Sequence, residues 1–285
     1  MINARKRPNS AAKSRSDNPA DISEASETDS LSFAPTQAKN IVAESERIND
    51  IVDQEKGFIG GEFKLGMIPT VMPTLLPMFL KTFIKHFPMV KLKIEELNTD
   101  ELINRIHEGH LDAAIAATPL RMNTIKERVL FYEPFVGYIS PNHRLKEKTA
   151  IEISDLDIND MLLLEDGHCF REGVLNLCKT LKEQQKETFK LESGSIEMLV
   201  KLSNEGMGMT LLPYLNTLDL KLTEQKNLRF FKKPPPAREV SLIYNKNELK
   251  IQIIEAIHRT ISGIIRGAIK FQDVEIISPI ANKKP

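Results

Sequence analysis

The sequence predicts an α/β protein of two subdomains, each built on a doubly wound parallel sheet. Short apolar strands alternate with helical periodicities from residue 62 onward, a pattern typical of buried parallel strands covered by helices. The alternation occurs in two successive sets, and 285 residues exceed the common size of a single core. With 41% apolar and 27% charged residues, the composition is that of a soluble globular chain.

The charge and hydropathy of the chain exclude several kinds of partner. Lysine and arginine number 39, as do aspartate and glutamate, so no global field attracts nucleic acid or an anionic membrane, and any DNA contact must be local. No segment approaches the roughly 20 apolar residues that span a bilayer, and the basic N-terminus is followed by no apolar stretch of a secretory signal. We therefore expect a cytoplasmic protein without membrane contact. In that compartment we expect two cysteines to be reactive or simply buried, and not to form a disulfide that stabilises the fold.

The N-terminal part divides into a tail and a helix. Residues 1–34 carry five bases and then five acids with almost no large apolar side chains, which predicts a disordered polar tail; a basic arm touching phosphates is the alternative. Over 35–57, apolar and small residues recur at spacings of three and four, as in a linker helix that pairs with a second helix. A single amphipathic helix lying on its own domain is the other interpretation. The recurring residues are Ala38, Ile41, Ser45, Ile48 and Val52.

The first regulatory subdomain is predicted to comprise residues 62–135 and 237–270. The earlier segment has strands at 62–68, 90–97 and 111–117, with Thr99 expected to cap the helix that follows the second strand. A late strand at 239–244 and a long helix return the chain to this subdomain, and residues 271–285 are expected to form a loose tail. The two helical faces consist of Leu76, Phe79, Leu80, Phe83 and Phe87, and of Ile253, Ile254, Ile257, Ile261, Ile264 and Ile265.

The second subdomain is predicted over residues 136–236, by the same alternation of strands and helices. One helix carries both cysteines and another follows Ser195. The two crossings between the subdomains are expected to form a hinge. The predicted strands lie at 136–140, 161–165, 188–193 and 209–213.

The first cysteine lies where a reactive thiol is favoured. Cys169 follows an apolar run and a glycine turn, which predicts a place in the first turn of a helix, where the macrodipole favours thiolate. His168 and Arg171 can add positive charge or a hydrogen bond. The alternative is that Cys169 is a small buried hydrophobe and His168 a satisfied turn residue.

The nine-residue separation between Cys169 and Cys178 predicts a switch. In a helix the two residues lie ~13 Å apart along the axis and roughly 180° apart around it, whereas a disulfide needs Cα atoms within about 7 Å. The pair therefore cannot bridge while the helix exists. A disulfide that forms only when the local fold opens is poorly suited to stabilise the structure. It suits a switch between a reduced and an oxidised fold.

Two threonines follow the ends of predicted parallel strands. Thr70 comes after the first strand and Thr99 after the second, and ligands of open parallel sheets bind beyond the carboxyl ends of strands. Each can hold a small polar ligand in a cleft between subdomains. As alternatives, Thr70 is a turn residue and Thr99 a helix cap.

Five stretches together resemble the regulatory domain of the OxyR peroxide sensors, a branch of the LysR-type transcription regulators. They are LLLEDGHCFREGVLNLC, LGMIPTVMPTLLP, GHLDAAIAATP, FYEPFVGYISPNH and GMGMTLLP. The resemblance runs from about Thr36 to about Ile265, and EDGHC with a second Cys nine residues on is specific to that branch. It implies a periplasmic-binding-protein-like (type 2) fold of two Rossmann-like subdomains, the LysR substrate-binding fold. It also implies dimers or tetramers that control oxidative-stress genes through promoter DNA and RNA polymerase.

The resemblance also implies roles for seven residues. Hydrogen peroxide is the signal: it oxidises Cys169 to a sulfenic acid, which Cys178 resolves to a disulfide, and no cofactor or metal is expected. The implied peroxide pocket consists of Thr70, Thr99, His168, Arg171 and Arg238.

The family's N-terminal winged helix-turn-helix has no counterpart ahead of residue 35. As written, the chain is not expected to read a DNA sequence alone, and it is interpreted as a truncated or frame-shifted product or as a partner in mixed oligomers.

Three other functions fit parts of the pattern. A LysR-type regulator could bind a small carboxylate in the cleft of Thr70 and Thr99 instead of sensing peroxide. A thiol peroxidase would use the same thiols, but the chain lacks a CxxC motif. An extracytoplasmic solute-binding protein shares the fold but needs a signal sequence. The sequence favours a regulator over an enzyme.

Overall fold

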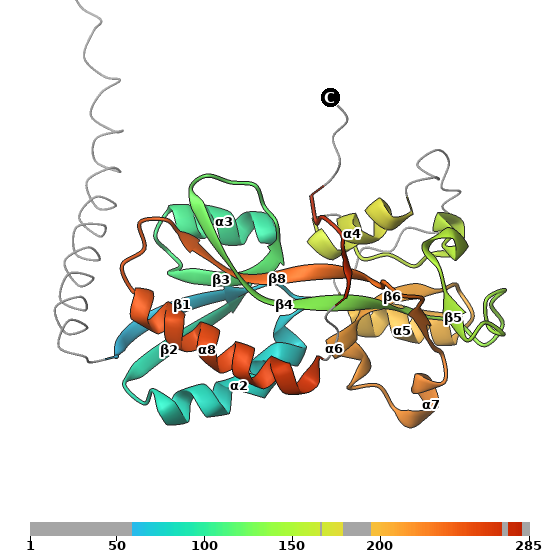
Figure 1. Cartoon of the computed structure of the whole chain (residues 1–285), viewed down its shortest axis with the longest axis horizontal. Helices are drawn as coiled ribbons and strands as arrows, with labels where there is room; N and C mark the ends of the chain where they lie inside the picture. Colours follow the sequence, from blue (N-terminus) through green and yellow to red (C-terminus); the bar gives the residue numbers. More distant parts are fainter. Residues whose placement is uncertain (1–58, 166, 179–194, 270–272, 281–285) are drawn as a thin grey trace, which may run out of the picture. The chain divides into compact units, whose positions relative to one another are not determined.

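The structure is a computed structural model that describes residues 59–165, 167–178, 195–269 and 273–280, all within one unit, Asn49–Pro285 (Figure 1). The predicted polar tail, the linker helix and the strand at 188–193 lie outside these residues.

The first sheet is mixed, not parallel throughout as the sequence predicts. β1 (Gly61–Met67) lies between β2 (Val90–Glu96) and β3 (Ala113–Thr118), and these three strands are parallel. β8 (Pro236–Asn245) then adds antiparallel to β3, and β4 (Ile125–Tyr138) antiparallel to β8. The reason is that a strand from late in the chain inserts between β3 and β4, so the order is not that of successive βαβ units.

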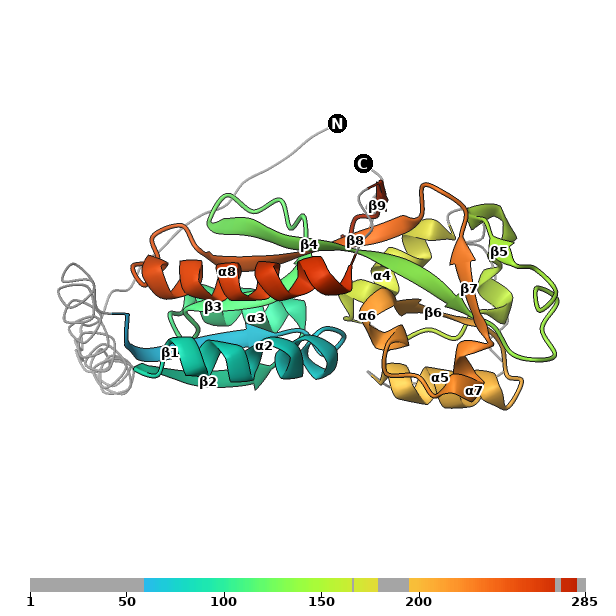
Figure 2. The ribbon, with the colours of Figure 1, turned by 60° about the horizontal axis from the view of Figure 1, so that its bottom comes forward.

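Three helices cover this sheet. α2 (Met72–His86) and α8 (Ile251–Ala268) pack side by side on one face, and α3 (Thr99–His107) lies on the other (Figure 2). Most of the predicted apolar faces are buried: Phe79 and Phe83 of α2, and Ile253, Ile254, Ile257, Ile261 and Ile265 of α8. The other predicted members, Leu76, Leu80, Phe87 and Ile264, are half-buried. Each fully buried side chain of this kind contributes roughly 1.5–3 kcal/mol of burial. We call this cluster, with the buried residues of β1, β2 and β3, the first core.

A second core forms around the C-terminal end of β4, where Phe135–Tyr138 pair with β6 (Thr210–Pro213) and Val136–Tyr138 with β7 (Leu228–Phe231). The strand predicted at 136–140 is thus the end of a much longer one. The surrounding elements are β5 (Ala150–Ile151), η1 (Ile153–Asp155), η2 (Ile158–Asp160), α4 (Cys169–Leu177), α5 (Ile196–Asn204), α6 (Tyr214–Thr217) and α7 (Leu222–Gln225).

The sequence predicts a strand at 161–165, and this prediction is wrong. Met161 makes one isolated bridge with Met209, and the segment then continues as buried irregular chain. The backbone of Leu162 is still satisfied, because its N–H donates to the Met209 carbonyl oxygen at 2.7 Å and its carbonyl oxygen accepts from the Thr210 hydroxyl at 2.9 Å. An apolar run alone does not distinguish a strand from buried coil.

Within the loose tail predicted at 271–285, residues 275–280 make defined contacts. β9 (Glu275–Ile276) pairs in parallel with the start of β8. The Asn176 Nδ2 group of α4 then donates to the carbonyl oxygens of Ser278 and Ile280, both at 3.0 Å. We call residues 275–280 the C-terminal strap, because these residues pair with β8 and contact α4, the helix that carries the cysteines. In the described part of the chain, no helix has the length and apolarity to cross a membrane.

Candidate functional site

Cys169 is the first residue of α4, as the sequence predicts. The preceding Gly167 has a φ of +89°, a left-handed conformation that favours glycine, and it turns the chain into the helix. His168 is the N-cap residue and is extended. The Cys169 side chain is half-buried and packs against the first core, so it lies at the positive end of a helix and at the edge of apolar surface.

Arg238 of β8 is the centre of the site, and 3% of its surface is exposed. Its Nη1 donates to the Thr70 hydroxyl at 2.7 Å and its Nη2 to the Thr70 carbonyl oxygen at 3.1 Å. Its guanidinium carbon lies 5.5 Å from the ring centre of Phe170, the residue after Cys169. The structure therefore joins two predicted pocket residues to each other and to the first turn of α4.

Glu133 is a site residue that the sequence analysis missed. It lies opposite Arg238 in the β4–β8 pairing and is 1% exposed. Its Oε2 accepts from Arg238 Nε at 2.9 Å and lies 2.8 Å from Nη2, and its Oε1 accepts the Leu215 N–H at 2.8 Å. An acid inside the apolar stretch LFYEPFVGY was the available indication, because a buried carboxylate requires a partner.

The sequence predicts Thr99 as the N-cap of α3, and this prediction is wrong. Asn98 is the N-cap: its side chain accepts the Glu101 N–H at 2.9 Å, and the Glu101 carboxylate accepts the Asn98 N–H in return. This capping box leaves Thr99 in the first turn with a buried hydroxyl. Among the described residues that hydroxyl has no hydrogen-bond partner.

His168 and Arg171 contact the segment just before the helix. His168 Nε2 lies 3.3 Å from the Glu165 carboxylate, and Arg171 Nη1 donates to the Leu164 carbonyl oxygen at 3.0 Å. These contacts fix the turn from which Cys169 projects.

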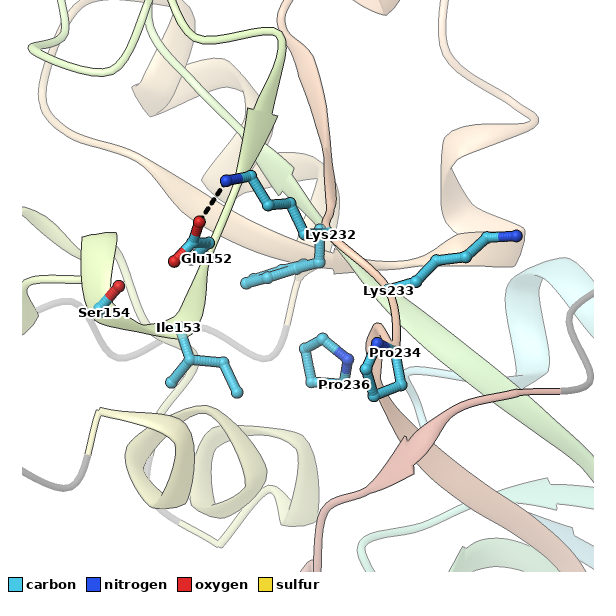
Figure 3. Close-up of a pocket in the computed structure, with 8 residues that line it drawn as sticks. Glu152, Ile153, Ser154, Lys232, Lys233, Pro234 and Pro236 are labelled. Atoms are coloured by element: carbon cyan, nitrogen blue, oxygen red, sulfur yellow. Dashed lines mark hydrogen bonds and ion pairs between the residues drawn. The ribbon is translucent and has the colours of Figure 1, made fainter.

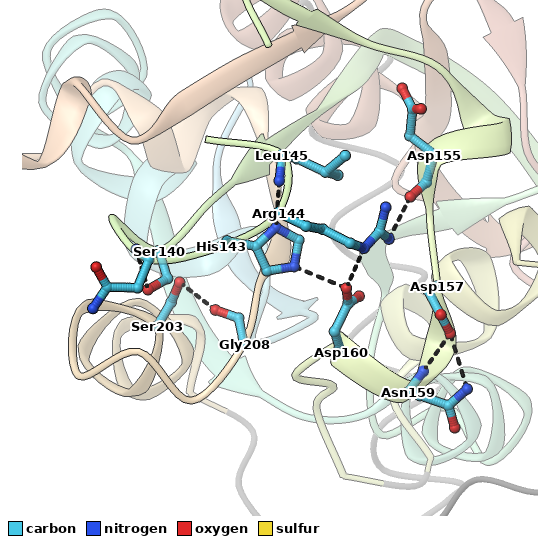
Figure 4. Close-up of polar contacts among 11 residues, drawn as sticks. Ser140, His143, Arg144, Leu145, Asp155, Asp157, Asn159, Asp160, Ser203 and Gly208 are labelled. Atoms are coloured by element: carbon cyan, nitrogen blue, oxygen red, sulfur yellow. Dashed lines mark hydrogen bonds and ion pairs between the residues drawn. The ribbon is translucent and has the colours of Figure 1, made fainter. Parts of the chain in front are cut away.

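Cys178 lies at the opposite end of α4, as its C-cap residue, and packs inside the second core with 4% of its surface exposed. Burial, together with the negative charges of Asp160 and Asp157, raises the pKa of its thiol to about 11. Asp160 itself accepts from His143 Nε2 and from Arg144 Nε, both at 2.9 Å (Figure 4). Both cysteines are free, and Cys178 is protonated at neutral pH.

A hollow of about 370 Å³ is lined by other residues (Figure 3). Neither cysteine and none of the predicted pocket residues lines it, and Lys232 at its wall is paired with Glu152. Within the ranges that the structure describes, no group of three or more His, Cys, Asp or Glu residues is arranged to hold a metal ion. The lining residues are Glu152, Ile153, Ser154, Phe231, Lys232, Lys233, Pro234 and Pro236.

Comparison with known proteins gives a consistent result. Residues 56–262 match the model of the LysR substrate binding domain. A probable hydrogen peroxide-inducible genes activator of Mycobacterium leprae is 29% identical over 219 residues, which cover 74% of this chain and 70% of that protein. The DNA-binding transcriptional dual regulator OxyR of Escherichia coli is 28% identical over 208 residues, covering 73% and 68%. The crystal structure of OxyR from Porphyromonas gingivalis is 25% identical with a TM-score of 0.68, covering 75% and 99%.

Proposed function

Because the chain belongs to the LysR substrate-binding domain family, we propose that it is an OxyR-like regulator that senses hydrogen peroxide through Cys169 and Cys178. The relatives that support this are named as hydrogen peroxide-inducible genes activators and as OxyR. They are regulators of transcription, not enzymes.

The observation that carries the proposal is the placement of the two thiols at opposite ends of α4. Cys169 lies at the first turn, beside Phe170 under the Arg238 guanidinium, and Cys178 is enclosed in the second core. The helix separates them by ~13 Å along its axis, so a disulfide requires α4 to unwind. Reduced and oxidised chains must then differ in fold at this helix, which gives a sensor its two states.

The chemistry proceeds in two steps. The Cys169 thiolate attacks one peroxide oxygen, an S–O bond forms, the O–O bond breaks, and the departing hydroxide takes a proton to become water; the sulfur is oxidised to sulfenic acid. Cys178 then loses its proton and attacks that sulfur, an S–S bond forms, and the sulfenic hydroxyl leaves as a second water. One peroxide thus oxidises two thiols.

Arg238, Thr70 and Thr99 are the residues we assign to the peroxide. Arg238 and the N-terminus of α4 stabilise the negative charge on the departing oxygen. The partnerless Thr99 hydroxyl donates to or accepts from peroxide, and Thr70 orients Arg238. His168 and Arg171 hold the turn that presents Cys169.

We infer that the output is control of oxidative-stress genes in the cytoplasm, through promoter DNA and RNA polymerase, by a dimer or tetramer. The name of the Escherichia coli relative states DNA binding, and the resemblance to the LysR-type regulators supports the oligomer.

The test is to treat the reduced protein with one equivalent of hydrogen peroxide, block free thiols, and look for the Cys169–Cys178 disulfide by mass spectrometry within seconds to minutes. Two controls are used: the Cys169→Ser variant treated in the same way, and the wild-type chain mixed with a solution from which catalase has removed the peroxide. Two free thiols after treatment of the wild-type chain would refute the proposal.

A further inference from the structure

Nearly all N–H donors of the Arg238 guanidinium are bonded to other groups of this chain. An arginine has five N–H donors in a planar fork. Glu133 lies against Nε and Nη2, and Thr70 accepts from Nη1 and Nη2. Four donors are therefore engaged, and one N–H of Nη1 has no partner among the described residues. A carboxylate ligand needs two parallel donors for a strong pairing, and this fork cannot supply them.

We propose that Glu133 is a built-in carboxylate that occupies the anion-binding side of Arg238 and thereby restricts the site to a small uncharged ligand such as hydrogen peroxide. This inference deepens the proposed function and rests on it. It assigns Glu133 as a positioning and specificity-determining residue, in contrast to an open site in which a small organic carboxylate binds Arg238.

The placement of Glu133 is fixed from two directions. The β4–β8 register puts it directly opposite Arg238, where cross-strand side chains meet on one face of the sheet. The Leu215 N–H holds its second oxygen at 2.8 Å, so the carboxylate cannot turn away to make room for another anion. The pair is neutral as a unit, and the buried site therefore offers no net charge that attracts an anionic ligand.

The same arrangement orients the free N–H. Glu133 lies on one edge of the guanidinium, Thr70 accepts from Nη1 and Nη2, and the ring centre of Phe170 is 5.5 Å from the guanidinium carbon. These contacts restrict rotation of the group and hold its remaining donor on the Thr70 side. Loss of the carboxylate would both free the guanidinium to turn and leave its charge unpaired. A mispositioned donor slows a reaction even when it remains in the site.

The experiment compares Glu133→Ala, which removes the carboxylate and leaves space for a small anion, with Glu133→Gln, which removes the charge but keeps the volume. Sodium formate and sodium acetate are the probes, and sodium chloride and acetamide at equal concentration are their controls. Asp112→Asn is the matched variant, because Asp112 is also a buried acid paired with a buried base, Lys250, but lies between Leu111 and Ala113 of the first core. The readouts are the melting temperature of the full reduced chain and the rate of Cys169 oxidation by peroxide.

We expect formate to raise the melting temperature of Glu133→Ala only, beyond any effect of chloride. We expect oxidation of Cys169 to be slowed by about tenfold or more in both Glu133 variants, and to be restored by formate in the alanine variant alone. Asp112→Asn should lose stability without a change in oxidation rate.

Two outcomes would overturn the inference: wild-type oxidation rates in Glu133→Gln, or equal stabilisation of wild type and Glu133→Ala by formate. If the alanine variant does not fold, the oxidation rate of Glu133→Gln decides alone. Failure of the proposed function is distinguishable, because it appears as no disulfide in the wild-type chain, whereas binding of formate to Glu133→Ala is measured without peroxide.

Discussion

The two thiols of this chain differ in what surrounds them, and that difference assigns their order of reaction. Cys169 is half-buried at a helix N-terminus, next to the residue that lies under Arg238. Cys178 is enclosed in apolar side chains, with carboxylates nearby that disfavour its anion. Since the thiolate is the nucleophile, peroxide should react with Cys169 and leave Cys178 intact until α4 opens.

The pKa of Cys178 gives a prediction about its reactivity toward alkylating agents. In a reduced Cys169→Ser chain, alkylation by iodoacetamide should keep rising up to about pH 11, because the pKa of the buried thiol is raised from 9.0 to about 11. Reaction rates followed by mass spectrometry measure this profile. The same chain in urea is the control and should level off near pH 9. A folded chain that levels off near pH 9 would show that Cys178 is not protected by burial.

The same shift has a consequence for stability, whose sign follows from linkage. A pKa that is higher in the folded chain gives stability that is fully present below pH 9 and is lost as pH rises through about 11. The loss amounts to about 3 kcal/mol for two pH units. Denaturant titrations of wild type and Cys178→Ala between these pH values should therefore converge as pH rises.

Substitutions of Thr99 and Thr70 separate effects on the free energy of unfolding from effects on the oxidation rate of Cys169. Thr99→Val should leave the free energy of unfolding unchanged or raise it by up to about 1 kcal/mol, because the buried hydroxyl has no partner in the described structure. Thr70→Val should lower it by about 1–2 kcal/mol, since Arg238 loses an acceptor. Both should slow peroxide oxidation of Cys169. Urea denaturation and stopped-flow oxidation measure the two effects, and a Thr99→Val chain that reacts like wild type would remove Thr99 from the pocket.

At the scale of elements, the C-terminal strap is the feature that couples most directly to α4. Asn176 is buried and donates to two strap carbonyls, so α4 holds the strap in addition to the pairing of β9 with β8. Asn176→Ala should lower stability by about 1–3 kcal/mol and raise hydrogen exchange at residues 275–280, while amides of β1 stay protected. Asn204→Ala, a change at the end of α5, is the control. Unchanged exchange of the strap would show that β9 pairing alone retains it.

Elements with strong periodicity were predictable from the sequence, and elements defined by distant partners were not. The isoleucine stripe of α8 and the first strand follow from local pattern, and both are confirmed. The insertion of β8 between β3 and β4 depends on pairing over more than a hundred residues, which no local pattern encodes. For the same reason Cys169 could be placed at a helix start from the sequence, while the pairing of Glu133 with Arg238 could not.

At the scale of the whole described unit, the two cysteines belong to different cores. Cys169 packs against the first core and Cys178 lies within the second, while β4 and β8 run from one core to the other (Figure 1). A disulfide must therefore take at least one sulfur out of its core. The change cannot stay local to one side chain, because α4 connects the two cysteines and also carries Phe170 and Asn176, the residue that contacts the strap.

Oxidation should accordingly open a defined part of the unit and leave the rest closed. After one equivalent of peroxide, hydrogen exchange should increase in 169–178 and in 275–280, because unwinding of α4 removes its own hydrogen bonds and the anchor of the strap. Amides of β1, β2, β3 and α8 should keep their protection, since their core includes Cys169 only at its edge. Reduction with dithiothreitol should restore both segments, and Cys178→Ser should show neither change. If exchange rises in α4 but not in the strap, the strap is held by β8 rather than by Asn176, and the structural change stops at the helix.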